Sequence, residues 1–248
     1  MLSMKPTPAM ELFFRRGQPT LIGVAEQLQE LYDFSRVIGE FSPLLQHWFL
    51  SSDKSKDDAL LYEAFDANGP TTAALAVLAQ KSEGVSDIRS MSLWNGADAE
   101  SENATPSSST NVLGRPDTVE FALRVTPEVA DWRTPAAWLH KAVSIWRPSV
   151  ATFGPYWYSD HKVFGDRPGA SWLLYLPRVL TVQQVAEARA LLPVMGKDEK
   201  GKDKQIGTIV VSVTDAPFSD ENPEHVKIAN AIEIRLVDQD LLPRYTDL

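Results

Sequence analysis

The sequence predicts an α+β protein with largely antiparallel sheets and flanking helices. Several segments alternate polar and apolar residues, which is the pattern of a half-buried strand. Others carry apolar residues at every third or fourth position, which indicates a helix lying on a core. The strand segments often follow one another without a helix between them, and this favours antiparallel sheets over a doubly wound parallel sheet. The elements fall into two strand–helix halves, which we expect to pack together.

The first half spans residues 1–94 and begins with an expected strand at 10–14. A helix is predicted to begin at Thr20, as its N-cap, and to end at Gly39. Its apolar residues recur so that they share one face: Leu21, Val24, Leu28, Leu31 and Ile38. The remaining elements of this half are two strands, expected at 46–50 and 88–94, and a helix, expected at 70–81.

Residues 95–111 are polar, and glycine, proline, serine and acidic side chains dominate them. A stretch with so little to bury is typical of a long loop. We therefore expect a polar loop or linker between the first half and a second half at 112–248. The alternative is a single domain overall, in which 95–111 is a surface insertion between paired strands.

The second half has clearer patterns. Its strands are expected at 118–125, 150–157, 172–176 and 207–214, and the run at 172–176 is apolar enough for a buried central strand. The charged run at 197–204 predicts a solvated turn between two strands. Three helices are predicted to begin at Thr134-Pro135, at the capping-box pattern Thr181–Gln184, and at Asn222-Pro223.

Composition excludes several classes of protein. The 248 residues include no cysteine, so disulfides, thiolate metal sites and cysteine nucleophiles are excluded. The net charge is −9, from 33 acidic and 24 basic residues, which makes nucleic acid a poor partner and a basic protein a better one. The N-terminal residues lack a signal-peptide pattern, and no apolar run approaches the length of a membrane span. We expect a cytoplasmic protein that does not bind a membrane.

The sequence carries no short catalytic motif. The four histidines show no helical metal spacing, and neither phosphate-binding glycine loops nor a Gly-x-Ser-x-Gly elbow occurs. Pro116-Asp117 with Asp198-x-Lys200 formally matches a metal-nuclease pattern, but Asp198 falls in the charged turn and such short matches arise by chance. The expectation is a protein that is not an enzyme and has neither a cofactor nor a metal.

Three aromatic residues stand in a row at Tyr156, Trp157 and Tyr158, close to Asp160. Strand alternation cannot send three consecutive side chains to one side, so at least one ring should be exposed or lie in a loop. Exposed Tyr and Trp beside a carboxylate are typical of a protein-interface hot spot. The alternative is that two of the rings fill the core and one flanks it.

The segment 153–158, Phe-Gly-Pro-Tyr-Trp-Tyr, and the segment 166–177, Asp-Arg-Pro-Gly-Ala-Ser-Trp-Leu-Leu-Tyr-Leu-Pro, carry a resemblance. They are similar to the immunity protein 52 family of bacterial polymorphic-toxin and type VI secretion systems. A related type VI immunity family has a Gly-Trp-Leu-x-Tyr-Leu segment, and Ser171 stands here in place of that glycine. The resemblance extends loosely over most of the chain. The motifs that carry it are mostly structural, so they indicate a family fold rather than the residues that contact a toxin.

This resemblance implies an immunity protein that neutralises a cognate nuclease toxin by stoichiometric binding, since members of the family are encoded beside such toxins. An acidic inhibitor would be attracted to the cationic surface of a nuclease. The expected partner-binding residues are the aromatic segment with its carboxylate, supported by acidic residues of the polar loop: Tyr156, Trp157, Tyr158, Asp160, Asp98, Glu100 and Glu102. The competing classes are a regulatory or scaffold protein and a small-molecule enzyme without a recognisable motif.

Overall fold

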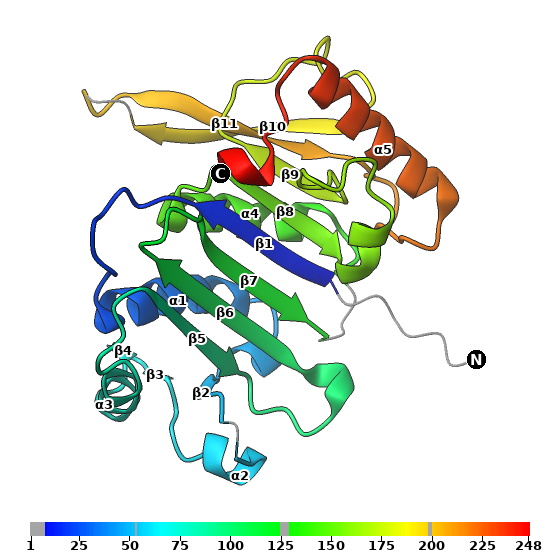
Figure 1. Cartoon of the computed structure of the whole chain (residues 1–248). Coiled ribbons are helices and arrows are strands. Elements are labelled where there is room, and N and C mark those ends of the chain that lie inside the picture. Colours follow the sequence, from blue (N-terminus) through cyan, green and yellow to red (C-terminus); the bar gives the residue numbers. More distant parts are fainter. Residues whose placement is uncertain (1–7, 53, 125–128, 198–199) are drawn as a thin grey trace. The chain divides into compact units, whose positions relative to one another are not determined.

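The structure, a computed structural model, describes residues 8–52, 54–124, 129–197 and 200–248. The chain forms two compact units (Figure 1). Unit 1 comprises Met1–Phe13 and Glu128–Leu248, and unit 2 comprises Phe14–Pro127. Each has strands paired antiparallel to their neighbours and helices beside them, so the predicted α+β class with antiparallel sheets is confirmed. Among the described residues, no helix is both long enough and apolar enough to cross a membrane.

The sheet of unit 1 places its most apolar strand in an interior position. Its strands lie in the order β10 (Ala190–Lys197), β11 (Asp203–Val211), β9 (Leu173–Leu176), β8 (Val150–Pro155) and β1 (Pro8–Phe14). All four residues of β9 are buried, as expected for a strand that pairs on both sides. The predicted central strand at 172–176 is therefore confirmed, with its start at Leu173.

Two helices complete unit 1. Helix α4 (Arg133–Trp146) packs on β8, where the rings of Trp138 and Phe153 lie 6.1 Å apart. Helix α5 (Pro223–Asp238) begins as predicted, because the side chain of Asn222 accepts a hydrogen bond from the amide of Glu224. Short 3-10 turns, η3 (Tyr156–Asp160) and η4 (Tyr245–Asp247), follow β8 and end the chain.

The strand β10 lies at the end of the strand order in unit 1 and pairs with β11. Pro193 stands inside this edge strand, where its missing N–H is tolerated. The pairing register shifts between Val194 and Met195, which marks a β-bulge. The sequence analysis expected a strand before the charged turn at 197–204 but gave it no range, and β10 is that strand.

Unit 2 contains strands in the order β7 (Asp117–Leu123), β6 (Ala104–Asn111), β5 (Ile88–Trp94) and β2 (Phe49–Leu50). Helix α1 (Val24–Gly39) contacts β6, and the ring of Phe121 packs against Phe34 and Trp48 at 5.6 and 5.8 Å. The smaller elements are η1 (Pro43–Leu45), α2 (Lys56–Ala59), β3 (Phe65–Asp66), β4 (Gly69–Pro70), α3 (Thr72–Lys81) and η2 (Glu100–Glu102). The strand at 88–94 matches its prediction, whereas Val125, within the predicted strand 118–125, lies outside the described residues.

The prediction that all of 95–111 is a polar loop was wrong for its second part, because Ala104–Asn111 forms strand β6. This strand pairs with β5 on one side and β7 on the other. Its inward positions alternate regularly but include Ser108 and Thr110, which hydrogen-bond within the unit instead of packing apolar surface. The polar composition of 104–111 therefore gave no indication of a strand. By compactness the chain divides at Phe13/Phe14 and at Pro127/Glu128, and the predicted boundary between two halves stays a prediction.

Two predicted helix starts were also wrong. Helix α1 begins at Val24, and no side chain caps it because its N-cap residue is Gly23. The preceding Ile22 is buried, and its carbonyl accepts from Arg89. At Thr181 the expected contact forms, with the amide of Thr181 donating to Gln184 Oε1 at 3.0 Å. The chain continues through turns into β10 without a helix.

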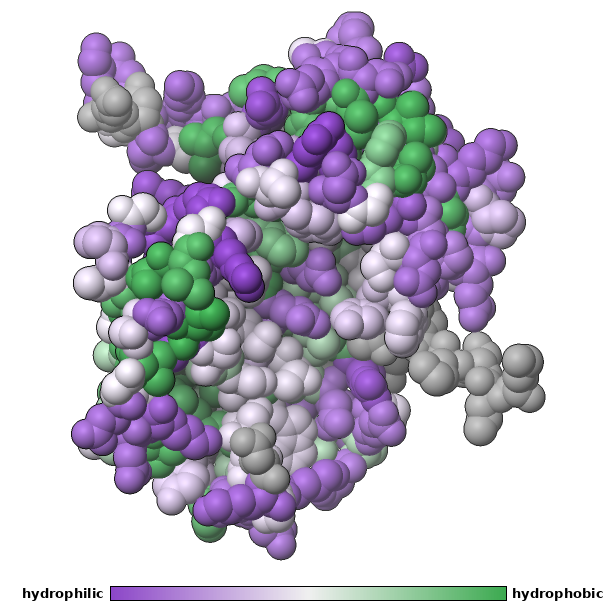
Figure 2. Space-filling view, in the orientation of Figure 1, coloured by the Kyte–Doolittle hydropathy of each residue, from purple (hydrophilic) through white to green (hydrophobic). Residues whose placement is uncertain are grey.

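Both hydrophobic and hydrophilic side chains are exposed on the surface. On the face shown in Figure 2, exposed hydrophobic residues form separate small groups among hydrophilic ones. The exposed large apolar side chains of unit 1 include Tyr156, Trp157, Val163, Val179 and Val182. Exposure alone therefore does not identify a partner-binding patch, and the packing and hydrogen bonds beneath each group must be compared.

Candidate functional site

The three consecutive aromatic residues occupy the turn η3, which directly follows β8. Tyr156 and Trp157 are exposed, at 46% and 49% of their surface, and their rings meet edge to face at 5.3 Å and 90°. Tyr158 is buried, at 3%. A 3-10 turn has three residues per turn, so consecutive side chains point in different directions. Two of the predicted residues therefore form an exposed aromatic pair, and Tyr158 belongs to the core beneath them.

Tyr158 is held by helix α5. Its hydroxyl lies 2.6 Å from Glu233 Oε1 and 3.0 Å from Asn230 Oδ1. Its ring packs edge to face on Phe218 at 5.6 Å. Burial raises the pKa of Tyr158, and the adjacent charge of Glu233 raises it further, so the hydroxyl keeps its proton and acts as a donor.

Glu233 is a buried carboxylate that holds the segment after η3 at two further points. Its Oε2 accepts from the amide of Val163 at 2.8 Å, and its Oε1 accepts from the amide of Ala170 at 2.9 Å. Burial raises the pKa of Glu233 above its ordinary value, and the hydrogen bonds from Tyr158, Ala170 and Val163 oppose this change. One side chain thus fixes the segment 158–170 against α5.

The close packing at this point requires a glycine. A Cβ atom on Gly169 would lie 2.7 Å from Cε1 of Tyr158 and 3.3 Å from Glu233 Oε1. Any larger residue would push the Tyr158 ring away from the carboxylate. The exposed pair therefore stands on a rigid base, which is the condition for a binding site to lose little conformational entropy when it binds.

Asp160 and the acidic residues of the predicted polar loop are all exposed. Asp160 ends η3 in unit 1, whereas Asp98, Glu100 and Glu102 lie between β5 and β6 in unit 2. Glu100 forms an ion pair with Arg124, and Lys56 Nζ donates to the carbonyl of Asp98 at 3.1 Å. The predicted residues thus belong partly to unit 1 and partly to unit 2.

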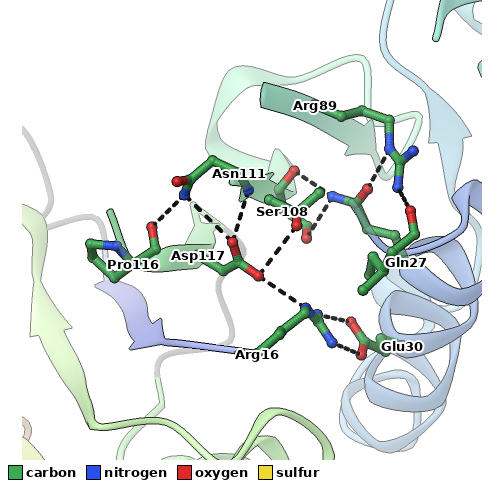
Figure 3. Close-up of polar contacts among 10 residues, drawn as sticks. Arg16, Gln27, Glu30, Arg89, Ser108, Asn111, Pro116 and Asp117 are labelled. Atoms are coloured by element: carbon green, nitrogen blue, oxygen red, sulfur yellow. Dashed lines mark hydrogen bonds and ion pairs between the residues drawn. The ribbon is translucent and has the colours of Figure 1, made fainter. Parts of the chain in front are cut away.

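The carboxylate of the nuclease-like pattern, Asp117, has a different role. It is buried at the start of β7 and accepts from Arg16 Nε at 3.0 Å and from the amide of Asn111 at 2.9 Å (Figure 3). Arg16 also binds Glu30 through two hydrogen bonds of 2.7 and 2.6 Å. Burial would lower the pKa of Arg16, but Glu30 and Asp117 outweigh it and raise the value.

A second part of this network explains the buried polar face of β6. Gln27 donates to the carbonyl and hydroxyl oxygens of Ser108 at 3.1 and 3.0 Å and accepts from Arg89 at 2.9 Å (Figure 3). Asp117 is therefore part of the internal structure of unit 2, and Asp198 lies outside the described residues. Within the described ranges, no group of three or more His, Asp or Glu side chains is arranged to hold a metal.

Sequence reasoning found the aromatic segment but not Glu233 or Asn230. A signal for Glu233 was present, because the buried face of α5 carries Ala229, Ile232 and Leu236. Position 233 lies four residues after Ala229 and three before Leu236, so its carboxylate had to lie on the buried face. A charged residue on such a face needs partners, and Tyr158 was available to provide one.

Comparison with known proteins shows a limited structural similarity. No family model matches the chain, and no curated protein matches it. Among solved structures, the Pseudomonas aeruginosa T6SS (type VI secretion system) protein PA0821 is similar over 92% of this chain and 72% of its own. The sequences are 11% identical and the TM-score is 0.48, which defines neither a family nor a function for this chain. Membership of the immunity protein 52 family stays a prediction.

Proposed function

We propose that this protein binds a cognate toxin stoichiometrically and neutralises it, as an immunity protein. The observation that carries the proposal is the exposed Tyr156–Trp157 pair on its fixed base. Tyr and Trp are the residues most enriched at interface hot spots, because they offer large rings with few rotatable bonds. A pair that the core has ordered in advance binds with a smaller loss of entropy.

Charge supports a basic partner. The chain has a net charge of −9, and Asp160, Asp98 and Glu102 present exposed carboxylates. A nuclease needs a cationic surface to approach phosphates, so an acidic inhibitor would be attracted toward it. In this proposal the aromatic pair supplies most of the affinity, and the carboxylates accelerate association and make it depend on salt.

The test is co-expression with the product of the neighbouring open reading frame, scored by growth and by co-purification. We expect the neighbour to be lethal alone, and this protein to restore growth and to form a complex of fixed stoichiometry. A harmless neighbour that forms no complex would overturn the proposal. Binding to several unrelated proteins without rescue would instead favour a scaffold.

Substitutions then locate the interface. Trp157→Ala should weaken the complex by about 2 kcal/mol or more, because truncation of a central aromatic residue is the most costly kind at interfaces. Val182→Ala is the matched control, since Val182 is an exposed apolar residue of the same unit. Equal affinities for the two variants would remove the aromatic pair from the interface. Asp160→Asn should mainly slow association and reduce its dependence on salt.

A further inference from the structure

Strand β11 is longer than the strand that pairs with its inner side. Residues 208–211 pair with β9, whereas β11 pairs with β10 along its whole length, apart from the bulge at Ile206. Strand β9 ends at Leu176, because Pro177 follows and the amide of Arg178 turns back to the carbonyl of Leu176. In the described part of the chain, residues 203–207 therefore have a strand on one side only (Figure 1). Such an edge offers backbone N–H and C=O groups to an extended segment.

A groove of about 810 Å³ lies beside this free edge, within unit 1. It is lined by Pro177, Val179, Lys197, Lys200, Lys204, Gln205 and Ile206. Its outer wall, the chain after β9, is held by the hydroxyl of Thr208, which donates to the carbonyl of Arg178 at 2.8 Å and accepts from the amide of Leu180 at 3.0 Å. The side-chain amide of Gln205 donates to the carbonyl of Gly207 at 3.0 Å. A carboxamide thus already makes the kind of hydrogen bond at this edge that a peptide would make.

The lining of the groove is basic, although the chain has a net charge of −9. Its described residues include three lysines and neither aspartate nor glutamate. The ammonium group of Lys204 makes no hydrogen bond or ion pair with another described residue. Lys197 lies 2.6 Å from Asp203, but both side chains are exposed, and such a pair exchanges partners at little cost. Val179 adds an exposed apolar side chain. The complementary ligand therefore carries carboxylates and apolar side chains together.

We propose that this groove binds an extended acidic segment of a partner protein, which adds to β11 as a strand where β9 has ended. The backbone of the segment hydrogen-bonds with residues 203–207, its carboxylates pair with Lys204 and Lys197, and its apolar side chains contact Val179 and Ile206. The bulge at Ile206 keeps the paired stretch short, so the side chains determine which segment binds. This site goes beyond the proposed function, since it requires neither the aromatic pair nor a toxin.

The test uses the full chain and a fluorescently labelled peptide that alternates glutamate and valine over six residues. We expect saturable binding by fluorescence anisotropy, and slower amide hydrogen exchange within residues 203–207 of the bound protein. The same peptide with alternate backbone nitrogens methylated keeps its charge but loses backbone donors, so it should bind roughly tenfold more weakly. A peptide that alternates lysine and valine should not bind, because its charge matches that of the groove.

Substitutions locate the site within the hairpin of β10 and β11. Lys204→Glu should weaken binding of the glutamate–valine peptide roughly tenfold or more, because it places a carboxylate in the lining of the groove. Lys202→Glu is the matched control, since it makes the same change of charge in the same hairpin at a residue outside that lining. Equal losses in the two variants would overturn the site, because the peptide would then respond only to the overall charge of the hairpin.

Other outcomes would also overturn the proposal. Equal affinity of the methylated peptide would exclude strand addition, and no binding of either acidic peptide would exclude the site. Tighter binding of a thymidine hexanucleotide than of the peptide would favour nucleic acid as the ligand. Concentration-dependent dimers that protect residues 203–207 without peptide would assign the groove to a second copy of the chain. These measurements need no toxin, so their result is independent of rescue by co-expression.

Discussion

The hydroxyl of Tyr158 lies 2.6 Å from Oε1 of Glu233, and both side chains are buried. This contact joins the turn that presents the exposed aromatic pair to helix α5, across 75 residues of sequence. A hydrogen bond to a buried carboxylate is stronger than a neutral one, and its loss leaves the acceptor without compensation. The contact therefore determines both the stability of unit 1 and the order of its exposed surface.

Tyr158→Phe should lower the free energy of unfolding of unit 1 by about 2 kcal/mol, since the Glu233 carboxylate then loses one of its charge-assisted donors. Urea denaturation followed by tryptophan fluorescence measures this change. Tyr156→Phe is the control, because the Tyr156 side chain is exposed and its change should stay within about 0.5 kcal/mol. Equal stabilities for the two variants would show that the buried contact contributes nothing.

Glu233→Gln should remove a pH dependence of stability. Burial raises the folded-state pKa of Glu233 above its ordinary 4.5, so between these two values the folded state binds more protons than the unfolded state. The contribution of Glu233 to stability therefore declines as pH rises through this window and is constant above it. Denaturation at a series of pH values should show the wild-type protein losing stability relative to the variant as pH rises. A difference that grows in the opposite direction would contradict the raised pKa.

Ser171→Gly should raise the free energy of unfolding by about 1 kcal/mol, because glycine adopts a positive φ without strain and removes the unpartnered hydroxyl. Ser171 has a φ of 46°, and its buried Oγ has no hydrogen-bond partner among the described residues. Arg147→Gly is a matched control, since Arg147 also has a positive φ, of 47°, but lies exposed at the end of α4. Thermal denaturation of both variants separates relief of the backbone from removal of the hydroxyl. A Ser171→Gly variant less stable than wild type would show that the hydroxyl is satisfied in the folded protein.

Arg16→Met should destabilise unit 2 by about 3 kcal/mol, because the buried carboxylate of Asp117 would lose its cation and Glu30 would lose two charged hydrogen bonds. Arg124→Met removes an exposed ion pair, to Glu100, and should cost less than about 1 kcal/mol. Chemical denaturation of both variants at neutral pH measures the contrast, and similar losses would contradict it.

The elements predicted correctly from the sequence are those in which the pattern of apolar side chains indicates the buried face. Residues 88–94 alternate apolar and polar side chains, and 173–176 form an apolar run as short as a buried strand, and both strands were placed correctly. Residues 104–111 were misread because their buried face holds Ser108 and Thr110, whose partners are Gln27 and Asp117. A hydrogen bond between positions 81 residues apart has no local signature.

The same reason limits the prediction of the candidate site. Alternation showed that Tyr156, Trp157 and Tyr158 could not share one side, but not which ring would be buried. That choice depends on Glu233 and Gly169, which meet Tyr158 only in the folded unit. The positive φ of Ser171 is a backbone angle that the residue type disfavours, so no sequence pattern indicates it.

The proline of β10 and the bulge in its partner β11 affect how copies of this protein can associate. A regular edge strand is a template on which another chain can add and begin aggregation. Along β10, Pro193 has no amide hydrogen to offer, and the bulge at Ile206 of its partner β11, opposite Val194 and Met195, increases the local twist. Unit 1 therefore keeps a buried, β-rich interior while its edge discourages the growth of ordered fibres.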